Sequence, residues 1–106
     1  MTMIFIETPV FTRRALDLLD DESYARLQIQ LVRDPCRGPV IEGTGGIRKI
    51  RIAANGRGQR GGARVIYYHF TSESRIALLL IYAKNEQPDL TPEQAKALKA
   101  VVANWR

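Results

Sequence analysis

An unbroken apolar run, residues 76–82 (IALLLIY), constrains the fold of this chain more than any other feature. A strand with one face in water alternates apolar and polar residues, whereas a continuous run of this length is typical of a strand covered on both faces. Even with Ala83 included, the run is far too short to cross a bilayer as a helix. The sequence therefore predicts a sheet that has this segment in its middle and is covered on both sides.

Three other segments are rich in strand-forming residues, namely residues 3–6, 47–52 and 64–70. Pro9 ends the first of these strands. A Gly-rich loop at residues 55–62 and a polar turn at residues 71–75 separate the strands of the second half, which predicts antiparallel hairpins.

Two helices are predicted between the first and second strands. We expect Thr12 to cap a helix that runs through about Leu19. A second helix begins near Asp20 or Asp21, has apolar residues at helical spacing, and is stopped by Asp34-Pro35.

The last helix has the clearest local signal, because Thr91-Pro92-Glu93-Gln94 is a capping box with Pro at the first helical position. An apolar stripe follows it and predicts packing against the sheet or a partner: Ala95, Leu98, Val101, Val102 and Trp105. The element order β-α-α-β-β-β-α predicts a single α+β domain over residues 1–106. Its sheet has about four strands and is rich in antiparallel pairs, with two N-terminal helices and one C-terminal helix.

The charge of the chain is positive and uneven. Lys and Arg number 16 against 11 Asp and Glu, which gives a formal charge of +5. Six basic residues and no acidic residue lie between Ile47 and Arg64. A small domain with one strongly positive face favours an anionic partner such as nucleic acid, an acidic protein or a membrane surface.

Several classes of protein are disfavoured by the composition. The single cysteine, Cys36, excludes an intrachain disulfide and indicates a reducing compartment. Residues 1–6 do not resemble a signal peptide, so we expect a cytoplasmic protein without membrane association. One His, one Cys and scattered carboxylates give no recognised ligand spacing, so we expect no metal and no other cofactor.

Three ordered motifs carry a resemblance to a known family: IEGTGGIRKIRIA at residues 41–53, RGGARVIYYHF at 60–70 and LLLIYAKNEQPDLT at 78–91. Together they resemble the RelE/HigB toxin superfamily, most closely its HigB-like branch, and the predicted element order agrees with the compact fold of these toxins. The resemblance implies a toxin that cleaves messenger RNA in the ribosomal A site through the ribose 2′-hydroxyl. It also implies a neutralising antitoxin, a helix-turn-helix protein of the HigA kind, whose complex with the toxin binds operator DNA.

The resemblance also assigns candidate catalytic residues. Lys49 and Arg51 match the basic pair on the second strand, and strand alternation places both on one face. Arg64 matches an arginine that follows a glycine and one other residue, and Lys84 matches a basic residue at the end of the last strand. Tyr82 is a candidate for stacking on a base or positioning a proton. Without the resemblance, a solvated strand face would be the better explanation of Lys49 and Arg51, a surface ion pair would explain Arg64, and an ordinary sheet aromatic would explain Tyr82 nearly as well.

Three further arginines, Arg48, Arg57 and Arg60, are candidates for binding messenger or ribosomal RNA, although a solubilising loop would also explain the last two. The chain departs from the family at residues 85–89 (NEQPD), where some members carry a tyrosine or histidine proposed to transfer protons. The residues therefore leave the general acid and base unassigned.

Three alternatives stay open at this point. The first is a toxin of the ParE type, which poisons DNA gyrase, although the clustered basic residues argue against it. The second is a non-catalytic basic module that binds RNA or an antitoxin by charge. The third is a relative that pairs with an antitoxin but no longer cleaves RNA.

Overall fold

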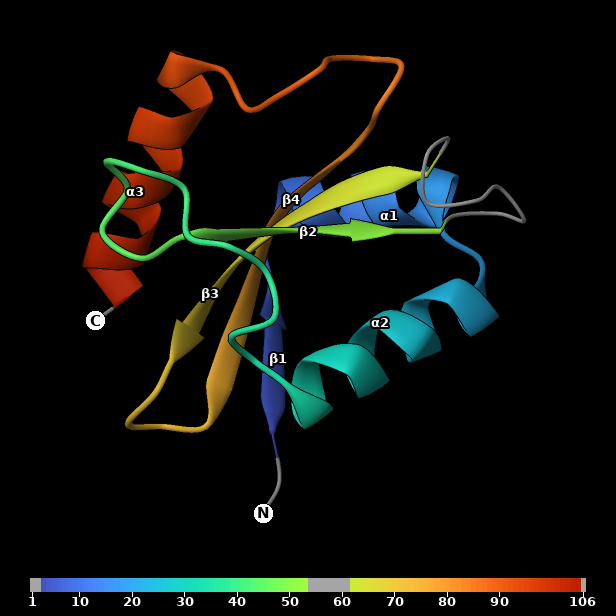
Figure 1. Cartoon of the computed structure of the whole chain (residues 1–106), viewed down its shortest axis with the longest axis horizontal. Coiled ribbons are helices and arrows are strands. Elements are labelled where there is room, and N and C mark those ends of the chain that lie inside the picture. The colour runs from blue at the N-terminus through green and yellow to red at the C-terminus, as the bar shows by residue number, and fades with distance from the viewer. Residues whose placement is uncertain (1–2, 54–61, 106) are drawn as a thin grey trace.

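The computed structural model describes residues 3–53 and 62–105, which form three helices and a four-stranded sheet (Figure 1). The elements follow the predicted order: β1 Ile4–Glu7, α1 Pro9–Leu18, α2 Asp21–Arg33, β2 Arg48–Ile52, β3 Ala63–Phe70, β4 Arg75–Ala83 and α3 Pro92–Trp105. The predicted α+β class is therefore confirmed.

The sheet has the strand order β1-β4-β3-β2, so the apolar run lies in an interior strand as predicted. β4 pairs antiparallel with β3, and β3 pairs antiparallel with β2. β1 pairs parallel with β4, which makes the sheet mixed. The second edge strand, β2, carries the basic residues of the first candidate motif.

Helices cover both faces of the sheet, with α1 and α2 on one side and α3 on the other (Figure 1). On the first side Phe11, Leu27 and Leu31 pack against strand residues such as Val65 and Leu78. On the second side Val102 packs with strand residues that include Ile66 and Leu79, and Leu98, Val101 and Trp105 pack against this cluster. Four of the five residues of the stripe predicted for the last helix, all but Ala95, thus pack in this cluster against the sheet.

A β-bulge in β4 changes which face its later side chains occupy. Tyr67 pairs with Leu78 but its neighbour Ile66 pairs with Leu80, so Leu79 is an extra residue in β4. Before the bulge, Leu78 lies in the core beside α1 and α2. After the bulge, Tyr82 lies in the core beside α3. Strict alternation would have put Tyr82 on the same face as Leu78, beside α1 and α2.

The cap of α1 differs from the predicted one. Thr8, not Thr12, is the N-cap, and its hydroxyl accepts a hydrogen bond from the Phe11 N–H (3.0 Å). Pro9 ends the strand as predicted, but it also begins the helix, because a proline at the first helical position needs no N–H partner. The Thr8 hydroxyl donates in turn to the Leu79 carbonyl (2.8 Å), which ties the start of α1 to the bulge.

The other two helix caps agree with the sequence. The Asp20 side chain accepts from the Ser23 N–H (2.7 Å) at the start of α2. Thr91 and Gln94 form the reciprocal capping box before α3, with hydrogen bonds of 3.1 and 3.0 Å. Within the described ranges, no helix has the length and apolar character needed to cross a membrane.

Candidate functional site

Three of the predicted site residues form a row across the sheet. Arg51 in β2 pairs with Arg64 in β3, and Arg64 pairs with Tyr82 in β4. Directly paired residues of antiparallel strands point to the same face, here the face that carries α3. Lys49 lies two residues before Arg51 and shares that face, while Ile50 and Ile52 point into the opposite core, as alternation predicted.

The pairing of two arginines is unfavourable for the fold, because like charges directly opposite each other in a sheet repel. Arg64 is also only 4% exposed, and buried arginines normally have their charge paired. A bound anion between Arg51 and Arg64 would relieve both effects. Planar guanidinium groups are well suited to hold a phosphate with paired hydrogen bonds.

Two buried polar groups in this row have no hydrogen-bond partner within the part of the chain that the structure describes. They are the Arg64 Nη1 and the Tyr82 hydroxyl. Native proteins rarely leave such groups unsatisfied, because a buried unpaired donor is destabilising by about 1–3 kcal/mol. Their position on adjacent strands favours a binding role for these atoms over a packing role.

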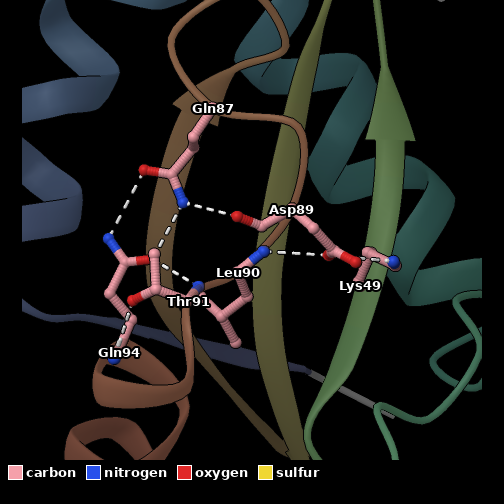
Figure 2. Close-up of polar contacts among 6 residues, drawn as sticks. All are labelled: Lys49, Gln87, Asp89, Leu90, Thr91 and Gln94. Carbon is pink, nitrogen blue, oxygen red and sulfur yellow. Dashed lines mark hydrogen bonds and ion pairs between the residues drawn. The ribbon is translucent and has the colours of Figure 1, made fainter.

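An acidic side chain that the sequence alone did not single out lies beside the row. The Asp89 carboxylate accepts a hydrogen bond from the Lys49 Nζ (3.2 Å), and Figure 2 shows it reaching from the loop after β4 toward β2. Its Oδ1 also accepts from the Leu90 N–H (2.8 Å). The loop itself is fixed by Gln87, whose Nε2 donates to the Asp89 carbonyl and to the Gln94 Oε1, both at 2.8 Å.

Electrostatics set the protonation of Tyr82 and Asp89. Burial raises the pKa of the Tyr82 hydroxyl, and the negative charge of Asp89 raises it further, while Arg64 opposes both. The Tyr82 hydroxyl is therefore protonated at neutral pH. The Leu90 N–H lowers the pKa of Asp89, and Lys49 and Arg64 lower it further, so Asp89 is ionised at neutral pH.

The remaining predicted residues are spread around this row. Lys84 is exposed just after β4, and its backbone N–H donates to the Gly62 carbonyl (3.2 Å), which holds the end of the strand beside the start of β3. Arg48 follows the alternation to the other face, where its Nη1 donates to the carbonyls of Gly38 (2.7 Å) and Cys36 (3.2 Å). The predicted RNA-binding residues Arg57 and Arg60 lie outside the described residues.

Two open clefts meet at Lys49. One has a volume of about 520 Å³ and is lined by basic side chains from Arg37 and Arg51 as well as Lys49. The other has about 550 Å³ and lies between Lys49 and the Asp89 loop, over the start of α3. Arg37 was not among the predicted residues, because nothing in the sequence places the loop after α2 beside β2.

Among the described residues, no group of three or more His, Cys, Asp or Glu side chains is arranged to hold a metal ion. His69 lies in β3, where burial and the positive charge of Arg48 lower its pKa, so it is neutral at pH 7. Cys36 is exposed and forms no disulfide.

Comparison with known families identifies the group to which the chain belongs. The family model described as the RelE toxin of the RelE/RelB toxin–antitoxin system matches residues 32–106 of the sequence. The matched region is more than half of the chain and contains every predicted site residue as well as Asp89 and Arg37. The chain therefore belongs to the RelE toxin family, as an endoribonuclease toxin of a toxin–antitoxin system with an antitoxin as its partner.

Proposed function

We propose that this toxin is a ribosome-dependent endonuclease that cleaves messenger RNA at codons in the A site. The observation that carries the proposal is the row Arg51–Arg64–Tyr82, in which two buried donors have no partner among the described residues. Lys49 extends the positive surface along β2. This arrangement matches the demands of a reaction in which the ribose 2′-hydroxyl attacks the neighbouring phosphate.

In the proposed mechanism Arg64 and Arg51 stabilise the additional negative charge on the phosphate in the transition state. Fixed cations do this well, because they need no reorganisation as the charge develops. Lys49 binds the same phosphate or the next one. Burial of Arg64 strengthens its effect, since the field of a charge is weakened less where water is excluded.

Tyr82 is the proposed proton donor to the leaving 5′-oxygen. Its raised pKa keeps the hydroxyl protonated, and the hydroxyl points to no described acceptor. Lys84 contributes positive charge at the end of β4. The lowered pKa of Asp89 makes it a weak base, so the 2′-hydroxyl proton passes to solvent water and not to this carboxylate, and water returns a proton to Tyr82 after cleavage.

Primer extension on a defined messenger tests ribosome dependence. The toxin is added to the free message, to programmed ribosomes, and to ribosomes whose A-site codon carries 2′-deoxynucleotides. We expect cleavage only on the ribosome and only where the 2′-hydroxyl is present. Cleavage of the deoxy codon would overturn the mechanism. If folded toxin cleaves no message, poisoning of DNA gyrase becomes the favoured hypothesis, and a supercoiling assay measures that activity.

We also propose that the reaction needs no metal ion. Ribosomes need Mg²⁺, so a chelator is not informative, and a phosphorothioate at the scissile phosphate is the better probe. If a phosphate oxygen binds a catalytic metal ion, its replacement by sulfur slows the reaction in Mg²⁺, and Mn²⁺ restores the rate. We expect no such rescue, and a rate restored by Mn²⁺ would contradict a metal-free mechanism.

The proposed partner is a helix-turn-helix antitoxin of the HigA kind, which carries the contact to operator DNA. The support is the resemblance of residues 41–53, 60–70 and 78–91 to the HigB-like branch. Gel-shift assays with the toxin alone and with the co-purified complex test it. Operator binding by the complex alone is expected, and specific binding by the free toxin would contradict it.

A further inference from the structure

Asp89 is the one acidic side chain that the structure shows in contact with a cationic residue of the site, among the described residues. Its carboxylate accepts from the Lys49 Nζ at 3.2 Å and is close enough to Arg64 and Tyr82 to interact with them electrostatically. An RNA phosphate would need the same ammonium group. A carboxylate and a phosphate on one lysine repel each other, so the two anions compete.

We propose that Asp89 is an internal competitor for the phosphate of RNA at Lys49 and thereby sets the affinity of the toxin for RNA. The inference rests on the proposed function in that it takes RNA as the ligand of this face. It adds an affinity-determining residue that opposes binding, in contrast to the cations that favour it.

The loop holds the carboxylate in place through its backbone. Gln87 fixes the Asp89 carbonyl, and Gln87 is fixed in turn by Gln94 of the capping box (Figure 2). The backbone at Asp89 is thus anchored to the start of α3 and presents its side chain to β2. A carboxylate on an unanchored loop would spend little time at Lys49.

The ion pair between Asp89 and Lys49 is weak enough for an RNA phosphate to displace the carboxylate. The Asp89 side chain is 64% exposed and that of Lys49 33% exposed, and ion pairs at such positions contribute little to stability. Rotation of the exposed side chain releases Lys49 without movement of the anchored backbone. Asp89 therefore lowers RNA affinity by a modest factor and does not block the site.

The variant Asp89→Asn removes the charge and keeps an oxygen for the Leu90 N–H. The probe is a short single-stranded RNA with 2′-O-methyl groups, which cannot react, and fluorescence anisotropy gives its Kd. We expect Asp89→Asn to bind about 1.5-fold to fivefold more tightly than wild type, the range set by an exposed ion pair. The log–log salt dependence should steepen by about 0.7, because the site presents one more net positive charge.

Three further variants separate competition at Lys49 from a general effect of charge. Glu93→Gln removes an exposed acidic charge from the first turn of α3 that forms no ion pair with Lys49 among the described residues, and it should change the Kd much less. Lys49→Ala should abolish the gain, so that Asp89→Asn has no effect in that background. A Gln94→Ala variant, which loosens the anchor without changing charge, should give part of the gain.

Unchanged or weaker binding by Asp89→Asn overturns the inference, and weaker binding would make Asp89 a residue that positions Lys49. An equal gain from Glu93→Gln overturns it as well, as does no measurable binding by either protein. Failure of the proposed function would give a different pair of results. In that case Asp89→Asn binds RNA more tightly while neither protein cleaves messenger on the ribosome.

Discussion

At the scale of single residues, the site consists of groups that serve the fold poorly. Arg64 is buried with an unpartnered Nη1, and Tyr82 is buried with an unpartnered hydroxyl, within the chain that the structure describes. Arg51 lies opposite Arg64, where like charges repel. Residues that destabilise the fold at one place are best explained by a ligand that uses them.

Removal of the Tyr82 hydroxyl tests this explanation. We expect Tyr82→Phe to leave the free energy of unfolding unchanged or to raise it by up to about 1 kcal/mol, because an unsatisfied buried group is lost. Cleavage should fall by about 10²-fold, the lower end for loss of a general acid. Urea unfolding and single-turnover cleavage measure the two effects, and a loss of stability without a loss of rate would contradict the assignment.

His69 predicts a pH dependence of stability. Its pKa is lowered in the folded state, mainly by burial, so the unfolded chain binds the proton more tightly. The part of the folding stability that depends on a neutral His69 is fully present above the ordinary histidine pKa of about 6.5. It is lost as the pH falls through the lower pKa of the folded state. Urea unfolding at pH 7.5 and 5.5 should show a drop that is smaller in His69→Gln. An equal drop in both proteins would contradict the assignment to His69.

At the scale of elements, the sequence predicted those features that depend on neighbours along the chain. The apolar run indicated the interior strand, and Thr91 and Gln94 indicated the cap of α3. Thr8 was missed because Pro9 suggests the end of a strand as strongly as the start of a helix. The rule that alternating strand residues share a face placed Lys49 and Arg51 correctly, and it also separates Arg48 from them.

The features that depend on contacts between distant segments could not be predicted. The bulge at Leu79 arises from the pairing of β3 with β4 and brings Tyr82 to the face of Arg64. Asp89 and Lys49 are 40 residues apart and meet only because the loop after β4 returns across the sheet. Arg37 reaches the same cleft from the loop after α2.

The two threonines of α1 give a matched test at this scale. Thr8→Ala removes the buried cap and the hydrogen bond to Leu79, which should destabilise the protein by about 1–2 kcal/mol. The exposed Thr12 hydroxyl donates to Glu7 (2.6 Å), and Thr12→Ala should cost less than about 0.5 kcal/mol. Urea unfolding compares them, and equal losses would contradict the assignment of Thr8 as the cap.

At the scale of the whole molecule, α3 and its preceding loop share one face of the sheet with the basic row, while α1 and α2 build most of the core on the other (Figure 1). The molecule thus divides into a supporting face and a charged face. Arg33, in the last turn of α2, is exposed and lines neither cleft, so it offers an arginine outside the clefts for comparison.

This division predicts how RNA binding responds to position as well as charge. Arg37→Ala should weaken binding of the unreactive RNA by about threefold to tenfold, because Arg37 lines the cleft beside Lys49 and Arg51. Arg33→Ala removes the same charge from outside the two clefts and should change the Kd by less than about twofold. Fluorescence anisotropy measures both, and equal effects would show that overall charge, and not the cleft, governs binding.

The single-turnover rate of cleavage of an A-site codon by wild type, Arg64→Ala and Arg33→Ala bears directly on the proposed site. We predict that Arg64→Ala, correctly folded by circular dichroism, cleaves about 10²-fold more slowly at saturating toxin, because a fixed cation is lost from the transition state. Arg33→Ala should cleave at the wild-type rate. A folded Arg64→Ala protein with the wild-type rate would contradict the assignment of the row on β2, β3 and β4 as the site of RNA cleavage.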